Sequence, residues 1–310
     1  MLTIPTKGMS RSVGCHNVDL DVLCDWIEGS LLLLEDDEIP DSDVHEILLE
    51  SGIYTGQDLA WGIVADAWSE LRRRQGWIRE HSPIAFVGRR IKRLRPWREV
   101  PAHSFCLALT LAKYYPKWAR GFGKNYTEQG ELFEQVTKSA LEALLPGWRI
   151  HSTGWTRTNA KKLKDVVDEV WGHLREPSID DLSLLAGEEA NEAGLDILCY
   201  RPFPDERTGI PVFLLQCASG AHWEDKVRTP PLSLWTKIVR FSSPRKAFAI
   251  PFALLDREFS NKSVLVEGML MDRYRLLSAA LHDPDWVPPQ LRARLVNWLT
   301  PRIKELPREN

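Results

Sequence analysis

The fold is decided by the stretch at residues 194–226, whose sequence is GLDILCYRPFPDERTGIPVFLLQCASGAHWEDK. Residues 194–201 and 210–219 are dense in Leu, Ile, Val, Phe, Cys and Tyr, and the segment between them contains Pro, Asp and Gly. Two apolar runs joined by turn-forming residues are typical of a β-hairpin. We therefore expect two antiparallel strands here.

Each strand of this hairpin carries one polar residue where an apolar one is expected. Asp196 interrupts the first apolar run and Gln216 interrupts the second. A carboxylate buried in a strand is costly unless it is paired, hydrogen-bonded or bound to a metal. Because the two residues lie on neighbouring strands, we expect their side chains to face the same point.

The composition is that of a globular protein, with 44% hydrophobic and 27% charged residues. A length of 310 residues allows two domains, or one large domain with extensions. No apolar run reaches the about 18 residues of a transmembrane helix, and the first residues lack the pattern of a secretory signal. These features predict a cytoplasmic protein without membrane association. The five cysteines form no CxxC pair, so neither a disulfide framework nor a zinc ribbon is predicted.

Charge is distributed unevenly along the chain. Residues 1–71 contain fifteen Asp and Glu against two Lys and Arg, whereas residues 72–124 contain fourteen Lys and Arg against two acids. A basic block interleaved with Trp and Tyr is typical of nucleic-acid binding. The alternative is that the block covers one domain face or pairs with the acidic block inside the chain. The candidate nucleic-acid contacts are Arg89, Arg90, Lys92, Arg93 and Trp223, of which Trp223 either stacks on a base or closes the core.

The first part of the chain predicts a helical N-terminal domain over residues 1–120. Apolar residues recur at helical spacing in three segments, and Ser42 is a candidate N-cap for the second. A short strand is expected over residues 84–87, and residues 104–115 are compatible with a helix or a buried strand. The three helical segments are 18–34, 42–52 and 55–74.

The remaining residues alternate between helical and strand patterns. This alternation predicts an α/β domain over residues 121–260, followed by a C-terminal helical extension over residues 261–310. The expected elements are a helix at 126–145, a strand at 148–152, a helical segment at 158–192, the hairpin, a helix at 232–239, a strand at 246–254, and two helices after residue 274.

Three short motifs follow this order of elements. Phe133 and Glu134 lie on the first helix, Gly194-Leu195-Asp196 opens one strand, and Gln216-Cys217-Ala218 ends the next. Over about residues 126–255 the chain resembles the PD-(D/E)XK nuclease superfamily, and within it the Mrr-like branch, which has an FE pair, a GxD strand and a QxK strand. The resemblance implies a restriction-endonuclease-like fold, in which a mixed sheet is flanked by helices.

The lysine of the QxK pattern is displaced in this chain. Alanine occupies position 218, where the superfamily has lysine, and Lys226 follows eight residues later. Lysine migration occurs within the superfamily, so Lys226 is the candidate for the missing ammonium group.

The resemblance also implies a metal site and a reaction. Mg²⁺, for which Mn²⁺ can substitute, would be held by Asp196, Glu134, the amide oxygen of Gln216 and the backbone carbonyl of Cys217, since Mg²⁺ prefers oxygen ligands. Lys226 would orient the attacking water and offset charge in the transition state. With Glu134, Asp196, Gln216 and Lys226 as catalytic residues, the implied activity is metal-dependent endonucleolytic cleavage of DNA.

The resemblance further implies a homodimer acting in bacterial restriction or anti-phage defence, with a partner protein of such a system as one possibility. The alternative is a catalytically inactive nuclease fold that binds nucleic acid or acts as a scaffold subunit. An RNA substrate in place of DNA is also an open alternative, because no feature of the sequence indicates recognition of a 2′-hydroxyl group.

Overall fold

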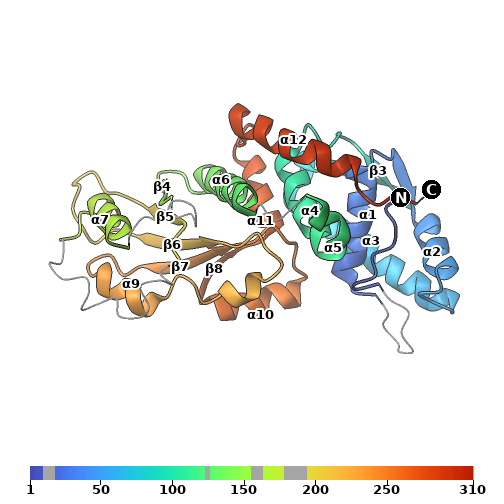
Figure 1. Cartoon of the computed structure of the whole chain (residues 1–310), viewed down its shortest axis with the longest axis horizontal. Coiled ribbons are helices and arrows are strands. Elements are labelled where there is room, and N and C mark those ends of the chain that lie inside the picture. The colour runs from blue at the N-terminus through green and yellow to red at the C-terminus, as the bar shows by residue number, and fades with distance from the viewer. Residues whose placement is uncertain (10–17, 123–125, 155–162, 178–193, 310) are drawn as a thin grey trace. The chain divides into compact units, whose positions relative to one another are not determined.

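The computed structural model describes residues 1–9, 18–122, 126–154, 163–177 and 194–309 (Figure 1). The chain divides into two compact units. Unit 1 comprises Met1–Lys124, Pro251–Ala253 and Arg273–Asn310, and unit 2 comprises Asn125–Ile250 and Leu254–Asp272. The residues from 273 onward therefore group with the N-terminal residues, whereas the sequence suggested a separate extension from 261. None of the described helices is both long and apolar enough to cross a membrane.

Unit 1 is mainly helical. The predicted helices over 18–34 and 55–74 are confirmed, and the 104–115 stretch is helical rather than a buried strand. Ser42 is not an N-cap: the second helix begins one residue earlier, after Pro40, and the Ser42 hydroxyl donates to Asp43. The helices are α1 (Leu20–Leu33), α2 (Asp41–Glu50), α3 (Gln57–Ile78), α4 (Pro101–Tyr114), α5 (Pro116–Gly121), α11 (Arg273–Leu277) and α12 (Pro289–Lys304).

Helices α1 and α4 form the centre of unit 1. Every residue of α1 from Val22 to Leu33 is buried, as is nearly all of α4. Most residues of α1 are apolar, as is typical of a helix that is buried on all sides. It packs against both α3 and α4. Asp25 and Glu28 of α1 are buried with the rest, so their charges need partners inside the unit.

A small antiparallel sheet completes unit 1. Its strands are β1 (Glu38–Pro40), β2 (Ile84–Val87) and β3 (Arg90–Arg93), in the order β1-β3-β2. The predicted strand over 84–87 is confirmed, and β1 and β3 are additional. The register places Glu38 of the acidic block opposite Lys92 of the basic block.

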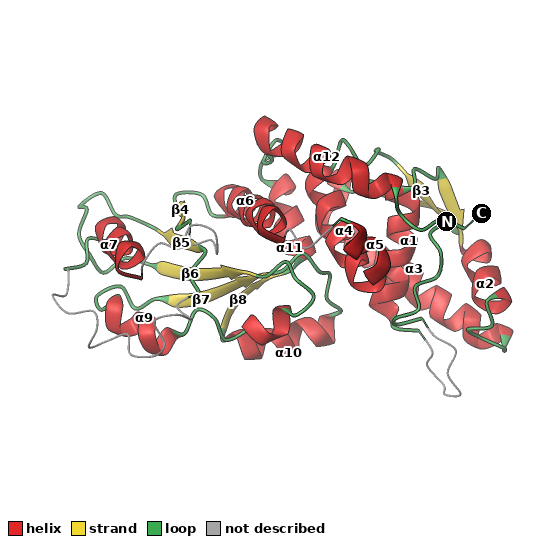
Figure 2. Cartoon of the chain, in the orientation of Figure 1, coloured by secondary structure: helices red, strands yellow, loops and turns green. Residues whose placement is uncertain are grey.

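Unit 2 is built on a mixed five-stranded sheet, which Figure 2 shows with helices beside it. The predicted hairpin is confirmed: Ile197 lies opposite Leu215, and Tyr200 lies opposite Val212. The sheet order is β4-β5-β6-β7-β8, with antiparallel pairing from β4 to β6 and parallel pairing from β6 to β8. The strands are β4 (Arg149–Ser152), β5 (Ile197–Tyr200), β6 (Val212–Cys217), β7 (Arg245–Ala249) and β8 (Gly268–Met271).

Helices pack against this sheet and bury its apolar side chains. Leu198 and Leu214 of the sheet belong to one core cluster with Val170 of α7 and Trp235 of α9, and α6 contacts β4 and β6. The class is thus α/β with a mixed sheet. The helices are α6 (Tyr126–Leu144), α7 (Leu163–Leu174), α9 (Leu232–Ile238) and α10 (Asp256–Val266).

The predicted elements of unit 2 agree with this architecture except at its last strand. The helices over 126–145 and 232–239 and the strand over 148–152 are confirmed. The strand predicted over 246–254 is present but shorter, since β7 ends at Ala249. Of the predicted helical segment 158–192, only 163–177 is described, and it contains α7. Strand β8 and the helix before it were not predicted.

Candidate active site

Asp196 and Gln216 meet at one end of the hairpin. Asp196 directly precedes β5, and its backbone N–H donates to the Leu215 carbonyl at 3.0 Å, so it continues the ladder with β6. Its Oδ2 atom accepts hydrogen bonds from Gln216 Nε2 and, at 2.7 Å, from the backbone N–H of Cys217. The expectation that the two polar side chains face one point is therefore confirmed.

The backbone of Asp196 is held in place by Thr153, the residue after β4. The Thr153 N–H donates to the Asp196 carbonyl at 2.9 Å, and the Thr153 hydroxyl donates to the Leu195 carbonyl at 2.5 Å. Thr153 is completely buried. Sequence reasoning missed this residue, because a single Thr after a short strand gives no signal of its partner.

The Gln216 side chain presents its amide nitrogen to the carboxylate. Besides Asp196, Nε2 donates to the Cys217 carbonyl at 3.1 Å, so this amide group bridges two oxygens that were expected to bind a cation. The side chain is buried, with Gln216 at 7% exposure. In this arrangement Gln216 donates to a partly buried carboxylate, whereas the resemblance implied that it offers its amide oxygen to a metal.

Glu134 of α6 supplies a second carboxylate near Asp196. Burial raises the pKa of Glu134, which a hydrogen bond with Ser152 of β4 partly offsets. Burial likewise raises the pKa of Asp196 to about 7; the Cys217 N–H opposes this rise, and the negative charge of Glu134 adds to it. The negative charge of Glu134 thus raises the pKa of Asp196, and a cation between such carboxylates would be favourable.

Lys226 lies within electrostatic reach of Asp196. It ends a short 3₁₀ helix, Trp223–Lys226, and its side chain is exposed. Its positive charge lowers the pKa of Asp196 against the larger effect of burial. In the part of the chain that the structure describes, no hydrogen bond or ion pair joins the two side chains. Ala218, at the expected lysine position, is buried, and its N–H donates to the Ala249 carbonyl at 2.9 Å.

The donor atoms at this site suit a hard cation. They are the carboxylates of Asp196 and Glu134 and the backbone carbonyl of Cys217, which are oxygen ligands of the kind Mg²⁺ takes. Burial raises the pKa of the Cys217 thiol well above its ordinary value, so its sulfur is not a ready ligand. Over the described ranges, no group of three or more His, Cys, Asp or Glu side chains is placed to hold a metal.

The predicted nucleic-acid contacts of the basic block are all paired with acidic side chains. The pairing involves residues 37–41, which include β1, so it favours the alternative that the two charged blocks neutralise each other within unit 1. The pairs are Arg89 with Asp41 at 2.6 Å, Arg90 with Glu38 at 2.5 Å, Lys92 with Glu38 at 3.0 Å and Arg93 with Asp37 at 3.0 Å.

Trp223 is a core residue rather than a stacking platform. It is 4% exposed, its ring lies 6.2 Å from the ring of Phe248, and the Lys262 ammonium group lies 5.4 Å from the Trp223 ring. A base cannot stack on a buried ring. Of the two alternatives for Trp223, the structure therefore shows that it closes the core.

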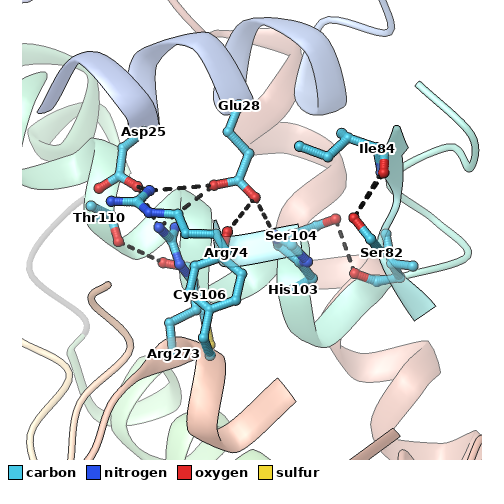
Figure 3. A network of polar contacts seen from close by, with 12 residues as sticks. Asp25, Glu28, Arg74, Ser82, Ile84, His103, Ser104, Cys106, Thr110 and Arg273 are labelled. Carbon is cyan, nitrogen blue, oxygen red and sulfur yellow. Dashed lines mark hydrogen bonds and ion pairs between the residues drawn. The ribbon is translucent and has the colours of Figure 1, made fainter. Parts of the chain in front are cut away.

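Sequence reasoning also missed a buried ionic cluster in unit 1 (Figure 3). Asp25 Oδ1 accepts from Arg74 Nη1 at 2.8 Å and from Arg273 Nη2, and Glu28 Oε1 accepts from Tyr274 Oη at 2.8 Å. Burial by itself would raise the pKa of Glu28, but the combined effect of Arg273, His103 and Arg74 holds this pKa well below its ordinary value. The two acids inside the apolar α1 sequence were the available signal, since buried charges require partners.

No protein-family model, no curated protein and no solved structure matches this chain. Fold and site together define an α/β unit with a mixed sheet, in which Glu134 lies within electrostatic reach of Asp196.

Proposed function

We propose that unit 2 is a restriction-endonuclease-like domain of PD-(D/E)XK type that hydrolyses DNA phosphodiester bonds with Mg²⁺ or Mn²⁺. The observation that carries the proposal is the meeting of Asp196, Gln216 and Cys217 at the end of the hairpin, with Glu134 and Lys226 in electrostatic reach. The order α6, β4, β5, β6, α9, β7 supports it, because it matches the order that the motif resemblance implies.

Each residue then has a role that follows from its chemistry. Asp196, Glu134 and the Cys217 carbonyl would hold the cation, which would polarise the phosphate and lower the pKa of an attacking water. Asp196 must be ionised to do so, and Thr153 fixes its backbone. Lys226 would place its ammonium group beside the negative charge that develops on the phosphate.

The biological setting belongs to the same proposal. Cleavage of DNA by a bacterial cytoplasmic enzyme of restriction or anti-phage defence is what the motif resemblance suggests. A homodimer would bring one site to each DNA strand, and a partner protein of the defence system would supply regulation.

Plasmid cleavage in Mg²⁺ or Mn²⁺ tests the proposal. We expect the wild-type chain to cut, and Asp196→Asn and Lys226→Ala to lose about a hundredfold or more in rate, as when one transition-state-stabilising group is removed. Lys237→Ala is the matched control, because Lys237 is also an exposed lysine of unit 2. Cutting that survives Asp196→Asn, or that needs no metal, would contradict the proposed site.

A second candidate function is a non-catalytic nuclease fold that binds nucleic acid or acts as a scaffold. The observation in its favour is that the Gln216 amide donates to two of the expected ligand oxygens, on Asp196 and Cys217, while alanine occupies the lysine position at 218. DNA binding by the wild-type chain without cleavage in either metal would support it. A labelled RNA of the same sequence, added in parallel, separates an RNA-directed nuclease from both.

A further inference from the structure

Unit 1 contains a pocket that the proposed nuclease site does not use. Every lining residue belongs to unit 1, and the pocket has a volume of about 70 Å³, several times the space that one water requires. Its polar lining consists of His81, Arg95, Glu99, His103 and Arg292. Its apolar lining includes Leu277 and Trp286. The pocket thus combines apolar side chains with two guanidinium groups.

Helix α4 begins in the wall of this pocket. Val100, Pro101, Ala102 and His103 all line it. Val100 is the N-cap, it provides no side-chain cap, and the first turn contains no acidic residue. The N–H of Ser104 is the first to bond within the helix, to the Val100 carbonyl at 3.0 Å. The backbone N–H groups of Ala102 and His103 therefore lie at the positive end of a 14-residue helix, which favours an anion.

Each of the two arginines uses one of its N–H donors in a hydrogen bond to a backbone carbonyl. Arg95 Nη2 donates to the Glu80 carbonyl at 3.1 Å, and Arg292 Nη1 donates to the Glu99 carbonyl at 3.0 Å. A guanidinium group has five N–H donors in a rigid fork, so donors remain for a ligand. Glu99 is the acid of the lining, and among the described residues it forms no ion pair with either arginine.

His103 makes this wall rigid. It is 4% exposed, and its Nε2 atom lies 2.6 Å from Glu28 Oε1 in the buried ionic cluster. Tyr274 donates to the same oxygen at 2.8 Å. The imidazole ring is thus held in one orientation between the cluster and the pocket, so the start of α4 is fixed before any ligand arrives.

We propose that this pocket binds an oxyanion group, phosphate or carboxylate, carried by a small molecule with an apolar part. The oxyanion would accept from Arg95, Arg292 and the first turn of α4, and the apolar part would lie against Leu277 and Trp286. The proposal is independent of the nuclease site, because it concerns a different unit and different residues.

Isothermal titration calorimetry of the full chain with phenyl phosphate, benzoate and inorganic phosphate tests this site. We expect saturable binding of phenyl phosphate, benzoate or both, and the tighter of the two identifies the oxyanion. Inorganic phosphate should bind more weakly, because it lacks the apolar part. Arg95→Gln and Arg292→Gln should each weaken binding by about tenfold or more, as expected when a hydrogen bond to a charged group is lost.

Arg98→Gln is the matched control, since Arg98 lies close in sequence but pairs with Glu35 and does not line the pocket. Circular dichroism confirms that each variant is folded. Absence of saturable binding to all three probes would overturn the proposal, as would equal binding by the wild-type chain and both pocket variants. Affinity that falls equally in Arg98→Gln would show general attraction of anions and would also overturn it.

Discussion

The amide nitrogen of Gln216 donates to Oδ2 of Asp196 across two neighbouring strands, and the same nitrogen reaches the Cys217 carbonyl at 3.1 Å. A donor group therefore lies between two oxygens that would be ligands in the proposed site. Hydrogen bonding by the amide and binding of a cation at these oxygens compete for the same lone pairs. This competition makes Gln216 the most informative position in unit 2.

Gln216→Glu should strengthen metal binding and weaken the metal-free fold. The added carboxylate increases the negative charge available to Mg²⁺, and we expect affinity to rise by about tenfold, or 1.4 kcal/mol. Without metal, loss of the donor and a second carboxylate beside Asp196 should cost about 1–3 kcal/mol of unfolding free energy. Calorimetric titration with Mg²⁺ and denaturant unfolding in chelator measure the two effects.

Gln129→Glu is the control for that substitution, because Gln129 is a partly buried glutamine of α6 that donates to Ser219 instead. Equal effects of both variants on Mg²⁺ affinity would mean that Gln216 has no special place in a metal site.

The stability of the metal-free chain should depend on the ionisation of Asp196. The pKa of Asp196 in the folded state is about 7, above its ordinary value of 3.8. A carboxyl with a raised pKa binds its proton more tightly in the folded state, so stability falls as pH rises through this window. The asparagine of Asp196→Asn does not titrate. Between pH 4 and pH 8 the unfolding free energy of this variant should therefore rise by about 2–4 kcal/mol relative to that of the wild type.

Denaturant unfolding in chelator at several pH values measures this difference. Parallel pH profiles for wild type and Asp196→Asn would contradict a raised pKa. Saturating Mg²⁺ should reduce the difference, because a bound cation favours the ionised carboxylate.

Removing one member of the buried ionic cluster should be severe. Arg273→Leu leaves Asp25 and Glu28 with fewer partners in a fully buried position, and we expect a loss of about 3–5 kcal/mol. Arg98→Ala removes an exposed pair with Glu35 and should cost at most about 1 kcal/mol. Equal losses in the two variants, measured by thermal or denaturant unfolding, would show that the cluster does not stabilise unit 1.

Gly268 at the start of β8 cannot accept a side chain without movement of the neighbouring strand. A Cβ atom there would lie 2.0 Å from the Lys246 carbonyl oxygen. Gly268→Ala should therefore cost at least about 1–3 kcal/mol through overpacking. Gly130→Ala in α6 is the control: a Cβ atom there meets nothing within 4 Å, and this substitution should stabilise the helix by about 0.5–1 kcal/mol. Unfolding midpoints that do not separate the two variants would refute the steric argument.

Charge reversal of Arg89, Arg90 and Arg93 should leave DNA affinity and its salt dependence unchanged. Each of these side chains is already paired with a carboxylate of residues 37–41, so few counterions would be released from DNA by them. Fluorescence anisotropy with a labelled duplex at several salt concentrations measures both quantities. A weaker affinity together with a flatter salt dependence would instead assign this surface to nucleic acid.

The hairpin and the meeting of its polar residues were predictable, because two apolar runs each carried one polar exception. Strands β1 and β3 were not: they are three and four residues long, and β3 has three charged residues among its four. Such strands carry no alternating apolar signal. The pairing of β1 (Glu38–Pro40) with β3, which brings the acidic and basic blocks together, was therefore not predictable from the sequence.

The candidate site was predictable in its members but not in its contacts. The motif identifies Gln216 as a site residue. It does not determine whether the amide oxygen or the amide nitrogen faces the site, because that depends on which atoms of Asp196 and Cys217 lie nearby. Burial of Trp223 likewise depends on Phe248, which lies on strand β7 and is 25 positions away in the sequence. Helix α10 gave no clear signal because only Val266 in it is buried, which leaves its apolar residues without a periodic pattern.

The ionic cluster also affects the order in which the two units can fold during synthesis. Asp25 and Arg273 are 248 positions apart in the sequence. During synthesis, the ribosome makes Asp25 and Glu28 of α1 long before it makes Arg273. All of unit 2 is also made before Arg273 and α12, which complete unit 1. Domains generally fold as units when their residues become available. We therefore expect unit 2 to reach its native state first on the ribosome, while unit 1 waits for the last part of the chain.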